Sequence, residues 1–170
     1  MQYLLDANVL ITANATYYEK GRVPHFWDWL ASEAAKGIVK IPQQILEEIT
    51  PSSKDWDFAD WISKNEGNLS LVEIVSGHHL NRVLQDGYEL EPSTIAESLP
   101  VSDRNDVMLI SYALAGSGDR CVVTLESKQE NAPPTLKPNR RKIPYVCRRL
   151  GIRPIDTFEL IRELDFRIPA

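Results

Sequence analysis

Four acidic residues lie in short motifs that suggest metal-dependent chemistry. They are Asp6 in LLDAN, Glu48 in LEEI, Asp106 in DVMLI and Glu126 in VVTLE, and these motifs contain no Lys or Arg. Carboxylates that share a site without basic partners repel one another unless a cation lies between them or some are protonated. Carboxylate oxygens suit Mg²⁺ or Mn²⁺, which lower the pKa of bound water and stabilise a phosphodiester during in-line attack.

The first two acids also have ordinary structural interpretations. Asp6 follows an apolar run that resists burying a lone charge, although a turn carboxylate bonded locally to Asn8 is a common alternative. Glu47 and Glu48 are adjacent, so only one of them can face inward from a helix. Glu48 flanks the apolar side of the expected helix and is the candidate; its alternative is a boundary glutamate in water.

Asp106 falls on the apolar stripe of an expected helix over residues 104–115. An acid there belongs either to a charged cluster or to the first turn of the helix, where the helix dipole supports it. Asp103, one turn earlier, is a second candidate. Its alternative role is an N-cap, with Asp106 completing a capping box.

Thr124 and Glu126 close the apolar run CVVTL. Side chains two residues apart on a strand share a face, so both can point into the crevice beyond a strand end. The alternative is an exposed glutamate that opens a polar loop.

Charge is unevenly distributed along the 170 residues, whose net charge is −5. Residues 1–130 contain 10 basic and 20 acidic residues, whereas residues 131–153 contain 7 basic residues and no acid. Such a segment can attract a polyanion, although a solvated surface is the usual fate of a charge run.

The elements that must position these residues alternate along the chain. Apolar runs predict strands over 2–5, 38–41 and 121–125, and irregular or strand structure over 69–75. Helices are predicted over 24–37, from Pro42 to Pro51, over 56–62 and 80–84, over 104–115, within 143–151 and over 157–164, with a loop over 127–139. This alternation predicts a single α/β domain over 1–170, a three-layer α/β/α sandwich with a short, mostly parallel central sheet.

Composition narrows the class of protein further. Two cysteines and three unclustered histidines argue against a disulfide framework or a zinc site, so a cytoplasmic, reducing location is expected. No apolar run approaches the roughly 18 residues of a membrane helix. The start of the chain lacks the basic region of a signal peptide, so we expect neither a membrane segment nor a signal peptide.

The four acidic motifs resemble those of PIN-domain nucleases, the fold of VapC-type toxins. The resemblance rests on LLDANVLI, PQQILEEI, DVMLISYAL and VVTLE, and it covers nearly the whole chain. The C-terminal stretch KIPYVCRRLGIRPIDTFELIREL resembles a bacterial PIN-like branch of unknown function. The family's usual fourth acid is Asp; the longer Glu126 could still reach a metal directly or through water.

The resemblance implies a Mg²⁺- or Mn²⁺-dependent endoribonuclease, the toxin of a type II toxin–antitoxin pair. Asp6, Asp106 and Glu126 would bind metal, and Glu48 would orient or deprotonate the attacking water. Asn8 and Thr124 would be supporting polar groups, and Asp103 an extra acid. The expected contacts to RNA phosphates are Lys137, Arg140, Arg141, Lys142, Arg148 and Arg149.

The resemblance also implies partners and leaves alternatives open. A small antitoxin protein would insert a segment into the acidic groove, and homodimers are common in the family. A non-catalytic PIN-fold module that binds RNA or protein is the main alternative. A phosphotransfer domain with Asp6 as acceptor is a third, although the chain lacks the Asp-x-Asp and Lys expected for it.

Overall fold

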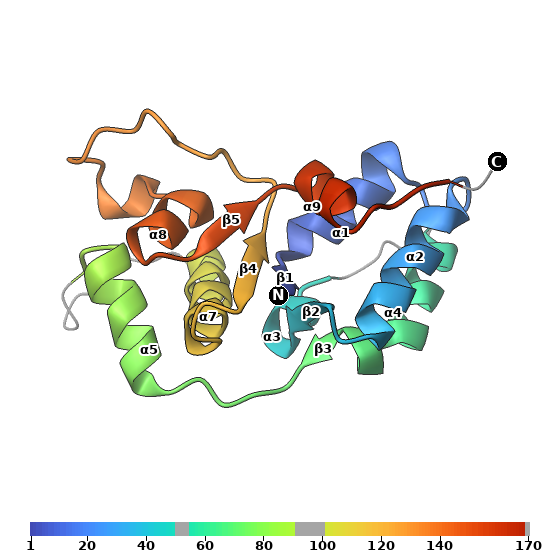
Figure 1. Cartoon of the computed structure of the whole chain (residues 1–170), viewed down its shortest axis with the longest axis horizontal. Helices are drawn as coiled ribbons and strands as arrows, with labels where there is room; N and C mark the ends of the chain where they lie inside the picture. The colour runs from blue at the N-terminus through green and yellow to red at the C-terminus, as the bar shows by residue number, and fades with distance from the viewer. Residues whose placement is uncertain (50–54, 91–100, 169–170) are drawn as a thin grey trace.

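A parallel five-stranded sheet forms the centre of the molecule (Figure 1). The structure is a computed structural model that describes residues 1–49, 55–90 and 101–168. The sheet order is β3-β2-β1-β4-β5, and every neighbouring pair is parallel. The strands are β1 (Gln2–Leu5), β2 (Val39–Pro42), β3 (Ser70–Leu71), β4 (Arg120–Val123) and β5 (Arg153–Ile155).

Helices cover both faces of this sheet. In Figure 1, helices α5, α7 and α8 lie on one side, and helices α1, α2, α4 and α9 lie on the other. Their bounds are α1 (Ala7–Thr12), α2 (Pro24–Ala35), α3 (Gln43–Leu46), α4 (Trp56–Leu69), α5 (Gly77–Arg82), α7 (Val101–Ala115), α8 (Ile143–Arg149) and α9 (Thr157–Glu163). Two π-helical turns, η1 (Ala13–Tyr17) and η2 (Val83–Gly87), and a 3₁₀ turn, η4 (Pro138–Arg140), complete the described elements. The predicted three-layer α/β/α class is therefore confirmed.

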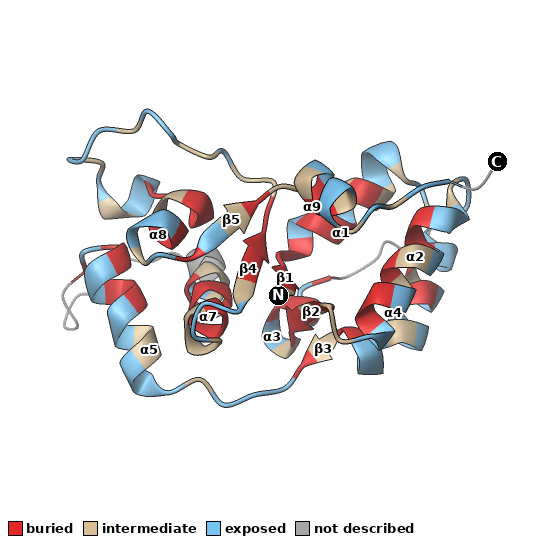
Figure 2. Cartoon of the chain, in the orientation of Figure 1, coloured by how far each residue is buried: buried red, intermediate tan, exposed pale blue. Residues whose placement is uncertain are grey.

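The two central strands are buried because helices cover both of their faces (Figure 2). This explains the near-continuous apolar sequences of β1 and β4. Their register pairs Leu5 with Val123, and β4 in turn pairs Val123 with Ile155. The next residue of each strand, Asp6, Thr124 and Asp156, therefore lies at the same carboxyl edge of the sheet.

Several predicted elements change at their boundaries. The helix expected from Pro42 to Pro51 has only the four residues of α3, so Glu48 lies in a turn after it. Helix α4 is longer than its predicted 56–62 core. The sequence also suggests a loop after the 80–84 helix that runs through Pro92, and Pro92 lies outside the described residues.

Helix α1 and strand β5 were not predicted. Residues 7–12 form α1, although their apolar run also suits a strand. Residues 153–155 form β5, whose Arg-Pro-Ile sequence has no strand pattern and whose conformation depends on pairing with β4. Among the described residues, no helix is both long and apolar enough to cross a membrane.

Candidate functional site

Asp6 is a buried carboxylate at the carboxyl end of the central strand β1, with 7% of its surface exposed. Thr124, at the end of the neighbouring strand, donates a hydrogen bond of 2.9 Å from Oγ1 to Asp6 Oδ2. Burial raises the pKa of the Asp6 carboxyl; the Thr124 hydrogen bond lowers it, and the negative charge of Glu126 raises it further. Asp6 and Thr124, both expected at strand ends, are therefore in direct contact.

Asn8 contributes through its backbone rather than its side chain. The residue is exposed on α1, and the backbone N–H groups of Asn8 and Ala7 lower the pKa of Asp6. These N–H groups belong to the first turn of α1, where helix N–H groups lack intrahelical partners. The effect of Asn8 on Asp6 is therefore exerted by the backbone at the start of the helix.

Glu126 lies beside this edge and is held by two partners. Its Oε2 accepts a 2.7 Å hydrogen bond from the backbone N–H of Ile143, the first residue of α8. Its Oε1 forms a 2.9 Å ion pair with Lys142 Nζ. Its own N–H donates to Thr124 Oγ1 at 3.2 Å, so Thr124 Oγ1 contacts both Asp6 and Glu126.

Glu48 follows α3, the helix after β2, which pairs with β1 on the side opposite β4. Its side chain is exposed and accepts a hydrogen bond from Asn105 Nδ2 on α7. Because Asn105 immediately precedes Asp106, this contact brings two predicted acids from segments 58 residues apart to the start of one helix. The helical period predicts Glu48 beside the buried stripe of a helix that runs from Pro42 to Pro51. Glu48 lies instead in an exposed turn, because α3 ends at Leu46.

Asp106 is half-buried in the first part of α7. It and Glu126 both act electrostatically on the buried thiol of Cys147, whose pKa burial raises strongly. The two carboxylates therefore lie near the same interior residue of α8. Asp103 is in the first turn of α7, and its side chain is outside the described residues.

The acids suit a hard divalent cation in their chemistry, and the structure brings Asp6 and Glu126 to one edge, where both contact Thr124 Oγ1. Within the described residues, no three His, Cys, Asp or Glu side chains are grouped as a metal site. Mg²⁺ is commonly bound by one or two carboxylates plus several waters, and Asp6 and Glu126 are two carboxylates at this edge. One observation favours a cation here: the negative charge of Glu126 helps raise the pKa of the buried Asp6 carboxyl.

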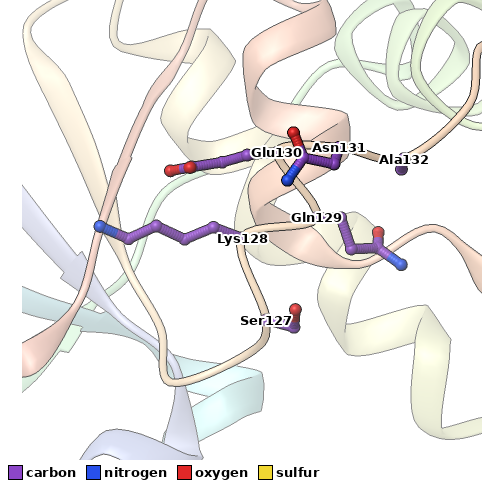
Figure 3. Close-up of a pocket in the computed structure, with 6 residues that line it drawn as sticks. All are labelled: Ser127, Lys128, Gln129, Glu130, Asn131 and Ala132. Carbon is purple, nitrogen blue, oxygen red and sulfur yellow. The ribbon is translucent and has the colours of Figure 1, made fainter.

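The loop after β4 is fastened to the basic segment by Gln129. Its amide nitrogen donates to Arg140 O at 2.8 Å, and its amide oxygen accepts from Lys142 N at 2.9 Å. Arg148 also donates to the backbone oxygen of Lys128. Residues 127–132 of this loop, which directly follow Glu126 in the chain, line an open hollow of about 510 Å³ (Figure 3).

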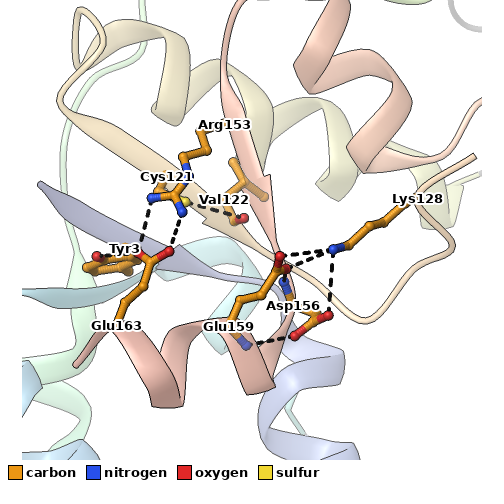
Figure 4. A network of polar contacts seen from close by, with 8 residues as sticks. All are labelled: Tyr3, Cys121, Val122, Lys128, Arg153, Asp156, Glu159 and Glu163. Atoms are coloured by element: carbon orange, nitrogen blue, oxygen red, sulfur yellow. Dashed lines mark hydrogen bonds and ion pairs between the residues drawn. The ribbon is translucent and has the colours of Figure 1, made fainter. Parts of the chain in front are cut away.

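A second acidic group at the same edge was missed by the sequence analysis. Asp156 and Glu159 form a capping box at the start of α9, and Lys128 Nζ contacts both Glu159 oxygens at 3.0 Å (Figure 4). The Asp-Thr-Phe-Glu sequence is a recognisable capping-box pattern. Both carboxylates accept hydrogen bonds from backbone N–H groups at the start of α9, and both form ion pairs with Lys128.

The predicted RNA-binding residues fall into two groups. Lys137 and Arg140 are exposed, and their side chains make no hydrogen bond or ion pair with any residue that the structure describes. Lys142 and Arg148 are also exposed, although Lys142 pairs with Glu126 and Arg148 bonds to the loop. Three of them, Arg140, Lys142 and Arg148, also contact Gln129 or Lys128 in the loop that lines the hollow.

Arg141 and Arg149 instead bind Glu89. The Arg141 side chain is only 1% exposed; it donates to Leu136 O and Gly87 O and pairs with Glu89 Oε2 at 2.5 Å. Arg149 pairs with the other Glu89 oxygen, and the Arg141 hydrogen bond keeps the pKa of Glu89 below its ordinary value. Arg141 therefore cannot contact RNA in this conformation, which corrects its predicted role.

Comparison with known proteins gives one family match. No curated protein and no solved structure matches the chain. The model of a domain of unknown function, DUF4411, matches residues 3–168, which include every acid and every basic residue described above. The chain therefore belongs to the DUF4411 family.

Proposed function

We propose that this protein is a metal-dependent endoribonuclease whose site is the carboxyl edge of strands β1 and β4. The observation that carries the proposal is the buried carboxylate of Asp6, which lies at the central strand end with Glu126 near it. Asp6, Glu126 and Asp106 would hold Mg²⁺ or Mn²⁺, which would supply an activated water and stabilise the phosphodiester during in-line attack.

The chain's own residues have distinct roles in this proposal. Thr124 orients Asp6 through its 2.9 Å hydrogen bond. Glu48, oriented by Asn105, is the exposed carboxylate that can orient or deprotonate water. Lys137 and Arg140 bind the RNA backbone electrostatically, without reading its sequence.

The experiment is cleavage of a mixed pool of single-stranded and structured RNA by the purified full chain. Reactions contain Mg²⁺, Mn²⁺ or EDTA and use wild type, Asp6→Asn, Asp106→Asn and an exposed control, Asp28→Asn. We expect cleavage with either metal, none with EDTA, and loss by at least 100-fold in the first two variants only. Circular dichroism checks that each variant is folded.

One result would contradict the nuclease activity itself, and another would contradict the metal-binding role of Asp106. Cleavage that survives both Asp6→Asn and EDTA would point to a contaminating enzyme. Loss of the folded state in Asp106→Asn would assign that carboxylate to helix capping instead.

A non-catalytic module that binds RNA is the second candidate. It is favoured by one observation: both oxygens of Glu126 already have partners within the chain, Lys142 and the N–H of Ile143. This candidate predicts salt-dependent RNA binding that is equal in EDTA and in Mn²⁺, with no cleavage in any reaction.

The proposal extends to the biological setting that the resemblance implies, the toxin of a type II pair acting in the cytoplasm. Both thiols of the chain are free and buried, which is compatible with a reducing compartment. Induced expression in bacteria should then arrest growth for wild type but not for Asp6→Asn. A small antitoxin that inserts a segment into the acidic groove should relieve the arrest. Equal growth of the wild-type and Asp6→Asn strains would argue against the toxin role.

A further inference from the structure

We propose that Lys142 is a built-in counter-ion that occupies the cation position at Glu126 and must leave before a metal binds that carboxylate. The inference rests on the proposed function, since it concerns the metal site of that nuclease. It assigns to Lys142 a role that differs from the RNA contact expected from its sequence. Lys142 is here a positioning residue that acts through Glu126.

The geometry of Glu126 makes the two cations alternatives. One carboxylate oxygen accepts the N–H of Ile143 at 2.7 Å, and the other pairs with the Lys142 ammonium at 2.9 Å. The Ile143 N–H is part of the backbone at the start of α8 and cannot leave without unfolding that turn. A divalent ion on Glu126 therefore takes the position of the ammonium, because two cations on one carboxylate oxygen repel each other.

Lys142 is able to make this exchange. Its side chain is 51% exposed, whereas Glu126 is 18% exposed, so the lysine can rotate into solvent while the glutamate stays in place. The backbone of Lys142 remains fixed, because its N–H donates to Gln129 Oε1 at 2.9 Å. The released ammonium thus stays in the basic segment next to Arg140, where it can contact a phosphate of the RNA.

Two consequences follow from this competition. The native protein binds metal more weakly than its carboxylates would allow, because metal binding must break an ion pair. Metal binding also adds one exposed positive charge to the RNA-binding surface, so metal and RNA favour each other's binding.

The test measures Mn²⁺ binding alone, without RNA, by electron paramagnetic resonance of the free ion. The full chain is compared with Lys142→Met, with the charge-conserving Lys142→Arg and with Lys137→Met, an exposed control in the same segment. We expect Lys142→Met to bind Mn²⁺ about tenfold more tightly than wild type. Lys142→Arg and Lys137→Met should remain within about twofold of wild type.

Asp6→Asn separates failure of this inference from failure of the proposed function. If Asp6→Asn abolishes Mn²⁺ binding but Lys142→Met binds no more tightly than wild type, the metal site stands and the role of Lys142 is overturned. If neither wild type nor Lys142→Met binds Mn²⁺, the metal-dependent function and this inference both fail. A gain that Lys142→Arg shares would also overturn the competition, since arginine keeps the charge.

Discussion

Asp6 is an acid whose surroundings disfavour its own charge. Burial and the neighbouring Glu126 raise its pKa, while Thr124 and the backbone at the start of α1 oppose that shift. A carboxylate held in this balance gains more from a bound cation than an exposed one does, because the cation removes an existing electrostatic penalty. Asp6 therefore lowers the folding stability of the metal-free protein and favours the binding of a metal cation.

Replacing Asp6 with Asn should stabilise the metal-free fold at pH 7. A pKa that is higher in the folded state than its ordinary value of 3.8 means that ionisation favours unfolding. The gain should therefore shrink as the pH falls toward 3.8, where both states take up the proton. Urea unfolding in EDTA at several pH values measures this, with Asp28→Asn as the exposed control; a less stable Asp6→Asn would contradict it.

Two adjacent arginines in the basic segment should have different effects when replaced by Ala, one on stability and the other on RNA binding. Arg141→Ala leaves two carbonyl groups and Glu89 without their buried partner, so we expect a loss of about 2–3 kcal/mol in stability. Arg140→Ala should change stability by less than about 0.5 kcal/mol. It should weaken RNA binding and lower the slope of log affinity against log salt by about 0.7. Equal effects of the two substitutions would contradict this division.

Among the secondary-structure elements, helix α9 links the sheet to the loop beside the candidate site. At its start, Asp156 and Glu159 bind Lys128 from the loop after β4. At its end, Glu163 accepts a 2.8 Å hydrogen bond from Tyr3 on β1 and pairs with Arg153 on β5 (Figure 4). One short helix thus holds β1, β5 and the loop beside Glu126 in a fixed arrangement.

The Glu163 contacts should make stability depend on acid pH. The Arg153 hydrogen bond lowers the pKa of Glu163 below its ordinary value of 4.5, so the contribution is present above pH 4.5 and is lost as the pH falls through the lower folded value. Glu163→Gln should be less stable than wild type at pH 7, and the two should converge in acid. Thermal unfolding at pH 7 and pH 3 measures this difference, and Glu66→Gln, an exposed change on α4, should show none. A difference that persists at pH 3 would instead indicate lost packing.

At the scale of the whole molecule, the interior contains both thiols of the chain. Cys121 lies in β4 and Cys147 in α8, and neither has a disulfide partner. Burial raises the pKa of Cys121 to about 12 and raises that of Cys147 strongly. The thiols should therefore be unreactive until the sheet and α8 separate.

Thiol labelling should report on global unfolding. At pH 8, we expect neither cysteine of the native protein to react with a disulfide reagent within minutes, and both to react at once in guanidinium chloride. The rate of native labelling should follow the population of the unfolded state as denaturant is added. Rapid labelling of one thiol in native buffer would show that α8 opens locally.

Local sequence pattern was sufficient for the central elements and for the first acid. Continuous apolar runs identified β1 and β4, and the position directly after β1 identified Asp6. The period of apolar residues identified α2, α7 and α9, because burial of one face imposes that period on any helix. Together these elements determined an α/β fold with acids at one edge.

Tertiary structure alone decided which of the charged side chains meet. Glu126 with Lys142, Glu48 with Asn105 and Arg141 with Glu89 are separated by 16, 57 and 52 positions, so no local period links them. Strand β5 likewise depends on its pairing with β4, since its three residues have no strand pattern. Secondary structure follows from short-range periodicity, whereas the partner of each charge follows from how the elements pack. The sequence therefore determined that Asp6 and Glu126 follow two strands, and only the packed fold decided that Lys142 of the same chain pairs with Glu126.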